Sequence, residues 1–460
     1  MTDDVASLTE TELHGSILGN RVLRSEDPRL LTGAAEYLAD LPFDEPLFAH
    51  FVRSPVAHGT IVSIEVDAAG DMPGVEAIWT ADDLGLDPHH GFAKIHDDFA
   101  RPPLASGRVR FVGEAIAVVF ADSAARAADA ADSVWAEIEP IRVHVEPEGA
   151  LASDAESIFP DAGDLRVRNV AVSDSSDPPL DLPARSDVVV RGRYVNQRVA
   201  VAPIEPHCFA AAPAEDGRLT VWPSNQFPHQ VRSQVAAAIG LPVEKVHVIT
   251  PQVGGGFGGK AGLQHEYTVV AAAAHRLERP VVWVPARSEE MQSAPHSRGQ
   301  VQYAELGCRA DGTFTGLKVR LVGDAGAYPG IGASLPGGTR RMAPGNYDFP
   351  AMEFDVAVAV TNTTPMGAYR GAGRPEATAL LERLVDQASH ELGIDPIELR
   401  ERNVLADDVF PFTSLTGNVY DSGRYLHPLR VAAEQIGYEE LRREQASRRS
   451  SGDPLQLGIG

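Results

Sequence analysis

Two glycine-rich segments, each predicted to lie between a strand and a helix, constrain this chain more than any other feature. The first, Gly254–Lys260, has five glycines in seven residues, and the second, Ala368–Glu376, stands directly before the most regular apolar pattern in the sequence. Glycine lets successive backbone N–H groups turn toward one point. The N-terminus of a helix adds a partial positive charge. Two such turns therefore predict one extended anionic ligand, held from two sides.

The first segment alone fits three interpretations. Gly254, Gly256 and Gly259 satisfy the dinucleotide-binding pattern, and the whole segment nearly satisfies the phosphate-binding P-loop. Ala261 weakens the P-loop interpretation, because a serine or threonine hydroxyl should bind magnesium there. Glu278 has the spacing of the acid that a dinucleotide site requires, but it lies at a predicted helix end. A glycine turn that only permits close packing is the third interpretation.

The second segment adds two arginines to its glycines. Arg370 offers planar, permanently charged donors to an anionic ligand, and Arg374 lies four residues later. The alternative makes both arginines surface partners of the abundant acidic residues. The presence of two glycine-rich turns favours the ligand-binding interpretation over that alternative.

Four regions follow from the apolar patterns: a polar, flexible N-terminus (1–20), a small α/β domain (21–146), a linker rich in Asp, Ser, Pro and Gly (147–186), and a larger domain (187–460). We expect helices at 123–133, 228–239 and 261–277, and a long helix from Pro375 that Gly393 ends. Asp395 is expected to cap the next helix. The expected strands lie at 47–52, 60–66, 114–120, 134–138, 187–194 and 245–250.

The overall charge and composition exclude several classes of function. A net charge of −24 argues against nucleic acid as a partner. No run of 18 apolar residues predicts a membrane span, and Met1–Gly15 lacks the basic and apolar regions of a secretory signal, so we expect a cytoplasmic location. Cys208 and Cys308 are too few for an iron–sulfur cluster or a four-cysteine zinc site and are expected to be buried. The histidines, among them His89, His90, His229 and His265, form no zinc-binding pattern.

Taken together, the motifs resemble the molybdenum-binding subunit of the xanthine dehydrogenase, aldehyde oxidase and carbon monoxide dehydrogenase family. Four further segments carry the same resemblance, which extends from about residue 19 to 460: Asp27–Gly33, Phe111–Glu114, Ile204–His207 and Ser224–Gln226. It implies an α+β fold, with an α/β hammerhead-like domain followed by the first molybdenum-pterin-binding domain.

The resemblance also implies a cofactor and a site. The cofactor is a molybdenum-pterin, in the form of molybdopterin cytosine dinucleotide, whose sulfurs bind the metal, so no residue of the chain ligates molybdenum directly. Gln226 is expected to hydrogen-bond an oxo group of the metal and, with Arg370, to act in catalysis, because amide and guanidinium donors stabilise negative charge on oxygen. The remaining cofactor-binding residues are expected to be Gly255, Gly256, Phe257, Gly258, Gly371 and Ala372.

Three departures from the family pattern restrict the function. Gly371 stands where carbon monoxide dehydrogenases carry a copper-binding cysteine, and Ala261 and Ala372 replace a glutamate and an aromatic residue of purine-oxidising relatives. An aldehyde or another N-heterocycle fits better than carbon monoxide or a purine. The family's catalytic glutamate, in a distant Gly-Glu motif of a second molybdenum-binding domain, has no counterpart here; Gly113-Glu114 belongs to the first domain.

The leading hypothesis is therefore part of a molybdenum hydroxylase that takes oxygen from water. The partners that the resemblance implies are a chain with the C-terminal half and its catalytic glutamate, a 2Fe-2S subunit, an FAD subunit and a small-molecule substrate. A P-loop-like nucleotide-binding protein and a non-catalytic homologue of the subunit are the alternatives.

Overall fold

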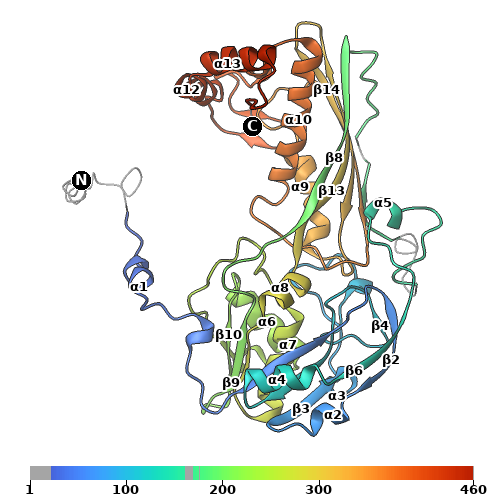
Figure 1. Cartoon of the computed structure of the whole chain (residues 1–460), viewed down its shortest axis with the longest axis vertical. Helices are drawn as coiled ribbons and strands as arrows, with labels where there is room; N and C mark the ends of the chain where they lie inside the picture. The colour runs from blue at the N-terminus through green and yellow to red at the C-terminus, as the bar shows by residue number, and fades with distance from the viewer. Residues whose placement is uncertain (1–21, 161–168, 176, 459–460) are drawn as a thin grey trace.

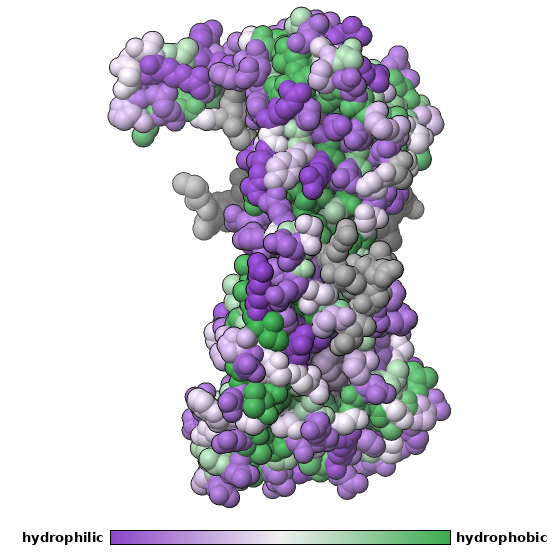
Figure 2. Space-filling view, turned by 90° about the vertical axis from the view of Figure 1, so that its right-hand side faces the viewer, coloured by the Kyte–Doolittle hydropathy of each residue, from purple (hydrophilic) through white to green (hydrophobic). Residues whose placement is uncertain are grey.

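The computed structural model describes residues 22–160, 169–175 and 177–458, which form two lobes stacked along the long axis of the molecule (Figure 1). The lower lobe contains a seven-stranded and a three-stranded sheet, and the upper lobe is built on a five-stranded sheet. Figure 2 shows the narrower region between the lobes, with hydrophilic side chains over much of that face. Helices and sheets occur in both lobes, and the predicted α+β class is confirmed.

The seven-stranded sheet joins segments far apart in sequence. Its order is β11 (Val246–Val248), β10 (Leu219–Pro223), β9 (Phe209–Pro213), β12 (Val281–Trp283), β1 (Leu47–Arg53), β5 (Ala115–Ala121) and β3 (Val75–Thr80). Leu47 pairs with Val281 in the parallel contact between β1 and β12. Strands from segment 21–146 and strands from after residue 200 thus share one sheet. The domain boundaries expected from the sequence remain predictions.

Within the N-terminal segment, β5 is buried along its whole length. The three-stranded sheet consists of β4 (Arg108–Val109), β2 (Gly59–Glu65) and β6 (Trp135–Pro140). The helices of this segment are α1 (Asp27–Leu31), α2 (Asp67–Gly70), α3 (Ala81–Leu84) and α4 (Ala124–Ala131), whereas α5 (Pro147–Ala150) packs against the five-stranded sheet. The predicted helix at 123–133 is confirmed as α4, and Ser123 Oγ accepts a hydrogen bond from Arg126 N–H at its start.

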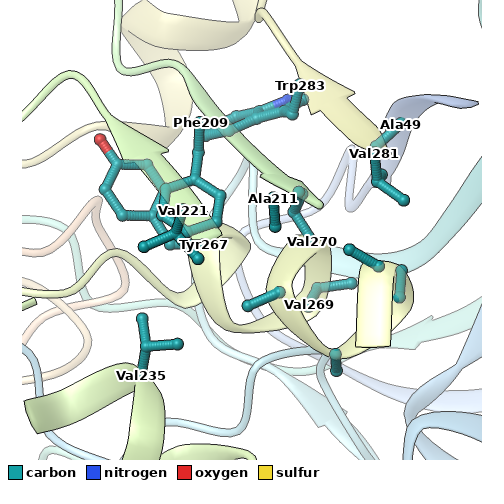
Figure 3. Packing of buried hydrophobic residues seen from close by; sticks show 14 of the residues in the cluster. Ala49, Phe209, Ala211, Val221, Val235, Tyr267, Val269, Val270, Val281 and Trp283 are labelled. Carbon is teal, nitrogen blue, oxygen red and sulfur yellow. The ribbon is translucent and has the colours of Figure 1, made fainter. Parts of the chain in front are cut away.

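The helix α7 (His265–Leu277) lies in the core of the lower lobe, beside α6 (Pro228–Ala238). Tyr267 of α7 stacks on Phe209 with 4.5 Å between ring centroids, and Trp283 lies edge-on to Tyr267 (Figure 3). The run of four alanines, 271–274, is buried because small side chains allow the helix to approach β9 closely. The sequence therefore located this helix correctly.

The predicted start of α7 at residue 261 was wrong by four residues. Gly262 has φ +73°, and a Cβ there would lie 2.7 Å from the backbone nitrogen of Phe92. Its carbonyl accepts a hydrogen bond from Asn225 Nδ2 at 2.8 Å. The chain therefore turns at Gly262, and the glycine loop does not lead directly into the helix N-terminus.

The upper lobe combines the second sheet with the long helix α10 (Arg374–Leu392). The sheet order is β7 (Val170–Asp174), β15 (Met352–Ala359), β14 (Phe314–Asp324), β13 (His296–Cys308) and β8 (Val188–Ala200). The predicted stop of α10 at Gly393, which has φ +67°, is confirmed. Asp395 caps α11 (Pro396–Asn403) by accepting the N–H of Ile397 at 2.9 Å, also as predicted. The predicted linker contributes β7 to this sheet.

The remaining elements are α8 (Arg287–Ser293), α9 (Leu335–Met342), β16 (Phe412–Thr413), β17 (Val419–Tyr420), α12 (Leu426–Gln435) and α13 (Tyr438–Ser451), with 3-10 turns at Leu38–Asp40, Asp97–Phe99, Val243–Lys245 and Ile331–Ser334. Within the described ranges, no helix combines the length and the apolar character needed to cross a membrane.

Candidate cofactor site

The glycine loop leaves consecutive main-chain donors free. Gly255 and Gly258 have φ near +95°, and Phe257 has φ +51°, which is unusual for a residue with a side chain. The backbone N–H groups of Gly255, Gly256 and Phe257 donate to no described residue. Three adjacent donors in such a turn form a concave site for an anionic oxygen. The sequence predicted such a cluster of backbone donors, but it placed the cluster directly at a helix N-terminus, whereas α7 begins only at His265.

A buried network fixes the start of the loop. Glu205 Oε2 accepts hydrogen bonds from Gly254 N–H at 2.8 Å, Ser224 Oγ at 2.5 Å and Lys260 Nζ at 3.1 Å. The Lys260 amine also donates to Ser224 Oγ at 2.7 Å, and its side chain is 0% exposed. Lys260 therefore cannot reach a phosphate, so the P-loop alternative is wrong. The family resemblance includes the segment Ile204–His207, but the sequence did not predict that Glu205 supports the glycine loop.

His207 holds the other end of the same loop. Its ring nitrogen Nε2 lies 3.1 Å from the carbonyl oxygen of Gly259, and Nδ1 lies 2.8 Å from Glu290 Oε1. Both ring nitrogens thus lie within hydrogen-bond distance of an oxygen acceptor. Glu290 Oε2 also accepts the backbone N–H of His207 at 3.0 Å. The Ile204–His207 segment therefore fixes both ends of the loop, at Gly254 and at Gly259.

Acidification is expected to destabilise this network. Burial alone would raise the pKa of Glu205 and of Glu290. A hydrogen bond from Ser224 to Glu205, one from His207 to Glu290 and the nearby positive charge of Lys260 outweigh burial, so both pKa values lie below the usual 4.5. Carboxyls with a lowered folded pKa stabilise the fold above their unfolded pKa, and that stability is lost as the pH falls through the folded values. The melting temperature of the full chain, measured by thermal unfolding, should therefore fall when the pH is lowered below about 4.5.

The Glu205→Gln variant should show a shallower loss of melting temperature with acid than the wild type. The exposed Glu244 serves as the matched control, and Glu244→Gln should follow the wild-type curve. Identical curves for wild type and Glu205→Gln would remove Glu205 as a source of the pH dependence.

Gln226 contacts the glycine loop with one half of its amide. Its Oε1 accepts the N–H of Gly258 at 2.8 Å, and its backbone N–H donates to the carbonyl of Lys260 at 2.9 Å. A Cβ on Gly256 would lie 2.6 Å from the Gln226 amide carbon, so a larger residue there would displace the Gln226 side chain. The Gln226 NH₂ group has no partner in the described chain and can donate to a ligand.

The second loop turns through three consecutive residues with positive φ: Gly371 (+106°), Ala372 (+47°) and Gly373 (+98°). The Ala372 N–H donates to Tyr369 O at 2.8 Å and closes the turn, so it is not available to a ligand. The N–H groups of Arg370 and Gly371 donate to none of the described residues. In this loop, Arg370 and Gly371 are therefore the residues whose backbone donors a ligand can use.

The two arginines of this loop form no ion pair with any residue that the structure describes. The exposed side chain of Arg370 has no hydrogen-bond partner there, and Arg374 Nη1 contacts the carbonyl of Gly371 at 3.2 Å. The alternative that these arginines are surface partners of acidic residues is thus not observed. The Arg370 guanidinium is free for an anionic ligand.

A third arginine, which the sequence did not single out, anchors the second loop. Arg298, in β13 with φ +68°, donates to the carbonyls of Tyr369 at 3.2 Å and Arg370 at 2.8 Å. It also lies 3.3 Å from the buried carboxylate of Glu376, which accepts the N–H of Gly373. An arginine at the start of a strand carries no sequence signal for this role, because its partners lie about 70 residues later.

Replacing Arg298 by methionine is expected to loosen the second loop. The carbonyls of Tyr369 and Arg370 lose their donors and Glu376 loses its partner, at a cost of about 1–3 kcal/mol in unfolding free energy. Hydrogen exchange measured by mass spectrometry should become faster in residues 368–374. Arg191→Met removes an exposed arginine of the neighbouring strand β8 and should leave that exchange unchanged. Unaltered exchange at 368–374 in Arg298→Met would contradict the anchoring role.

The two loops meet. A Cβ on Gly258 would lie 3.3 Å from both Cβ and O of Ala368, so the glycine loop and the second loop are in van der Waals contact. Gly258 and Ala368 also line one cavity. The two glycine-rich segments, about 110 residues apart in sequence, therefore form one site with free main-chain donors, a free amide and a free guanidinium. These groups fit an anionic cofactor.

The other candidate residues lie outside this site. Cys208 and Cys308 are buried, as predicted. No group of three or more potential metal ligands occurs among the described residues. Glu114 is buried and accepts the N–H of Arg110 at 2.6 Å; burial, the largest influence, raises its pKa.

Comparison with known protein families agrees with this geometry. Residues 169–404 match the molybdopterin cofactor-binding domain, and residues 32–141 match the a/b hammerhead domain of aldehyde oxidase and xanthine dehydrogenase. The chain therefore belongs to the aldehyde oxidase and xanthine dehydrogenase family of molybdopterin-binding proteins. The predicted order, a hammerhead domain followed by a molybdenum-pterin-binding domain, is confirmed.

Individual relatives are similar over nearly the whole chain. The large subunit of nicotine 6-hydroxylase from Paenarthrobacter nicotinovorans is 35% identical over 96% of this chain and 55% of its own length. The structure of quinoline 2-oxidoreductase from Pseudomonas putida 86 superposes with a TM-score of 0.87, at 36% identity, over 94% of this chain and 56% of that one. The chain thus spans about half the length of these relatives. The large molybdopterin subunit of nicotinate dehydrogenase from Eubacterium barkeri is 30% identical and is covered over 99% of its length.

Proposed function

We propose that this chain is part of a molybdenum-dependent hydroxylase that oxidises an N-heterocycle or an aldehyde. The observation that carries the proposal is the contact between the two loops, with free donors from both on one site. The names of three relatives, which refer to nicotine, nicotinate and quinoline, favour an N-heterocycle. A non-catalytic homologue would have no use for a free amide and a free guanidinium beside the loop.

The chain's own residues would hold the cofactor and stabilise charge. The N–H groups of residues 255–257 and of Arg370 and Gly371 would bind its anionic oxygens, with the Arg370 side chain as a charged donor. Gln226 would donate its NH₂ group to an oxygen on which negative charge develops during the reaction. When bound, the molybdenum-pterin, which we take to be the cytosine dinucleotide form, supplies two-electron hydroxylation chemistry with oxygen from water.

Several parts of the reaction are assigned outside this chain. Glu114 has no access to the site, because it is wholly buried against Arg110. We therefore place the catalytic glutamate in a second molybdenum-binding domain, and the 2Fe-2S and FAD centres on partner subunits of a cytoplasmic complex. Carbon monoxide is disfavoured as substrate, because Gly371 has no thiol and both cysteines are buried.

The test is to purify the native complex and measure its subunit masses and its molybdenum, pterin, iron and flavin content. Stoichiometric molybdenum with oxidation of quinoline or benzaldehyde by an artificial electron acceptor would support the proposal. Carbon monoxide should give no activity. A complex without molybdenum, or one with full molybdenum that oxidises neither substrate class, would refute it.

A further inference from the structure

A cavity adjoins the point where the two loops meet. One wall comes from residues 89–93 of the N-terminal segment together with Phe99 and Arg101. A second comes from residues 258, 259, 261 and 263–265, and a third from residues 328–331 and 365–368. A molecule in this cavity would touch Gly258 and Ala368, the residues that join the two loops. The cavity therefore leads away from the proposed cofactor site toward the hammerhead segment.

Arg101 is a buried cation with unused donors in this wall. The residue is 4% exposed, and its guanidinium donates no hydrogen bond to any described residue; Nε and Nη2 are buried without a partner. The nearest carboxylate oxygen is Glu266 Oε1 at 4.0 Å, and that oxygen already accepts Arg53 Nη1 at 2.9 Å. A buried guanidinium without partners is costly, because it has lost its hydration. An anionic oxygen in the cavity would satisfy it.

The position of Arg101 is well defined. Its backbone forms two hydrogen bonds of 3.0 Å with His89, and its guanidinium lies 5.0 Å from the ring centre of Phe111 and 5.9 Å from that of Tyr328. The other nearby carboxyl is Glu114, whose raised pKa, caused by burial, favours its neutral form. Neither carboxyl forms a hydrogen bond with Arg101, which leaves its Nε and Nη2 donors for an external anion.

The remaining walls suit a flat aromatic ring. His89 and His265 stack in parallel with 4.3 Å between ring centres. Burial lowers the pKa of His89 to about 4 and that of His265 well below its usual value, so both rings are neutral near pH 7. Phe92 and Tyr328 add further aromatic surface. Neutral aromatic rings beside a guanidinium with unused hydrogen-bond donors define the chemistry of the ligand.

We propose that this cavity binds the substrate, and that the substrate is a planar aromatic compound with a carboxylate that Arg101 receives. The proposal rests on the proposed function for the identification of this ligand as the substrate, and it narrows the substrate class. The guanidinium and the carboxylate can form two parallel hydrogen bonds, an arrangement that selects an acid over the matching amide. Arg101 would be a specificity-determining residue in the hammerhead segment.

The test compares benzoate with benzamide, two probes of similar shape that differ in charge, by calorimetric titration of the purified full chain at pH 7.5. We expect benzoate to bind at least about tenfold more tightly than benzamide to the wild type. Arg101→Gln should abolish the preference while leaving benzamide binding unchanged. Lys94→Gln, which removes an exposed positive charge one residue from the cavity wall, should keep the preference.

The outcomes separate the possibilities. Three outcomes would overturn the proposal: equal affinity of the wild type for the two probes, no binding of either probe, or a preference for benzoate that survives Arg101→Gln. In each case the donors of Arg101 would be satisfied by buried water and not by the ligand. If Arg101→Gln does not fold, as judged by circular dichroism, the wild-type comparison still decides. Ala93→Trp, which narrows the cavity from the same wall without removing the guanidinium, should weaken the binding of both probes. Molybdenum content of the native complex tests the proposed function separately, since benzoate can bind to a chain that carries no metal.

Discussion

Replacing Gln226 by glutamate is expected to lower the turnover number of the complete complex by about 10²-fold. The reason lies in the two halves of the amide. Oε1 accepts the N–H of Gly258, and a carboxylate can still do so, whereas the free NH₂ group is lost. If that NH₂ group stabilises negative charge in the transition state, then its removal slows the reaction without detaching the glycine loop.

Two further variants define the result. Gln226→Ala removes both halves of the amide and should lower turnover at least as much as Gln226→Glu, with molybdenum content close to wild type in both. Gln252→Glu places the same added charge near the loop without touching Gly258, and it should retain most of the activity. Wild-type turnover of Gln226→Glu at full metal loading, with loss only in Gln226→Ala, would reduce Gln226 to a support for the loop.

The sequence predicted those parts of the regular structure that follow from local patterns, and it missed others, among them the long strands β13, β14 and β15. The apolar spacing after Pro375, the stop at Gly393 and the cap at Asp395 all lie within one segment, and all three predictions are confirmed. The start of α7 failed because it depends on the distant Phe92, against which Gly262 packs. Similarly, no local pattern reveals that β1 pairs with β12, more than 230 residues later.

In the candidate site, too, local features could be predicted from the sequence and contacts between distant residues could not. Glycine spacing predicted where backbone donors would be free, and the structure has three of them at residues 255–257. Glycine spacing could not predict which donors the turns consume, such as the N–H of Ala372, which donates to the carbonyl of Tyr369; its role in binding the cofactor stays a prediction. The supports of the loops, Glu205 and Arg298, were missed in that role because the loop residues that they hold are far away in sequence and are contacted through backbone atoms.

Replacing Lys260 by methionine is expected to destabilise the chain by about 3–5 kcal/mol and to reduce cofactor loading. Lys260 is 0% exposed, and its amine is the positive charge that Glu205 contacts, at 3.1 Å. Methionine has a similar length but leaves the Glu205 carboxylate, which is 11% exposed, without that charge. The carboxylate would then hold Gly254 less firmly, and the free donors of the next three residues would lose their fixed geometry.

The double variant Lys260→Met with Glu205→Gln distinguishes this cause from simple loss of packing. A neutral amide can still accept from Gly254 N–H and Ser224 Oγ, so the double variant should recover most of the stability in urea unfolding, with an interaction energy of about 2 kcal/mol or more between the two sites. Lys245→Met, at an exposed position, should have almost no effect. Additive losses in the double variant would show that Lys260 acts through its volume, and the glycine loop would then be held by packing instead of charge.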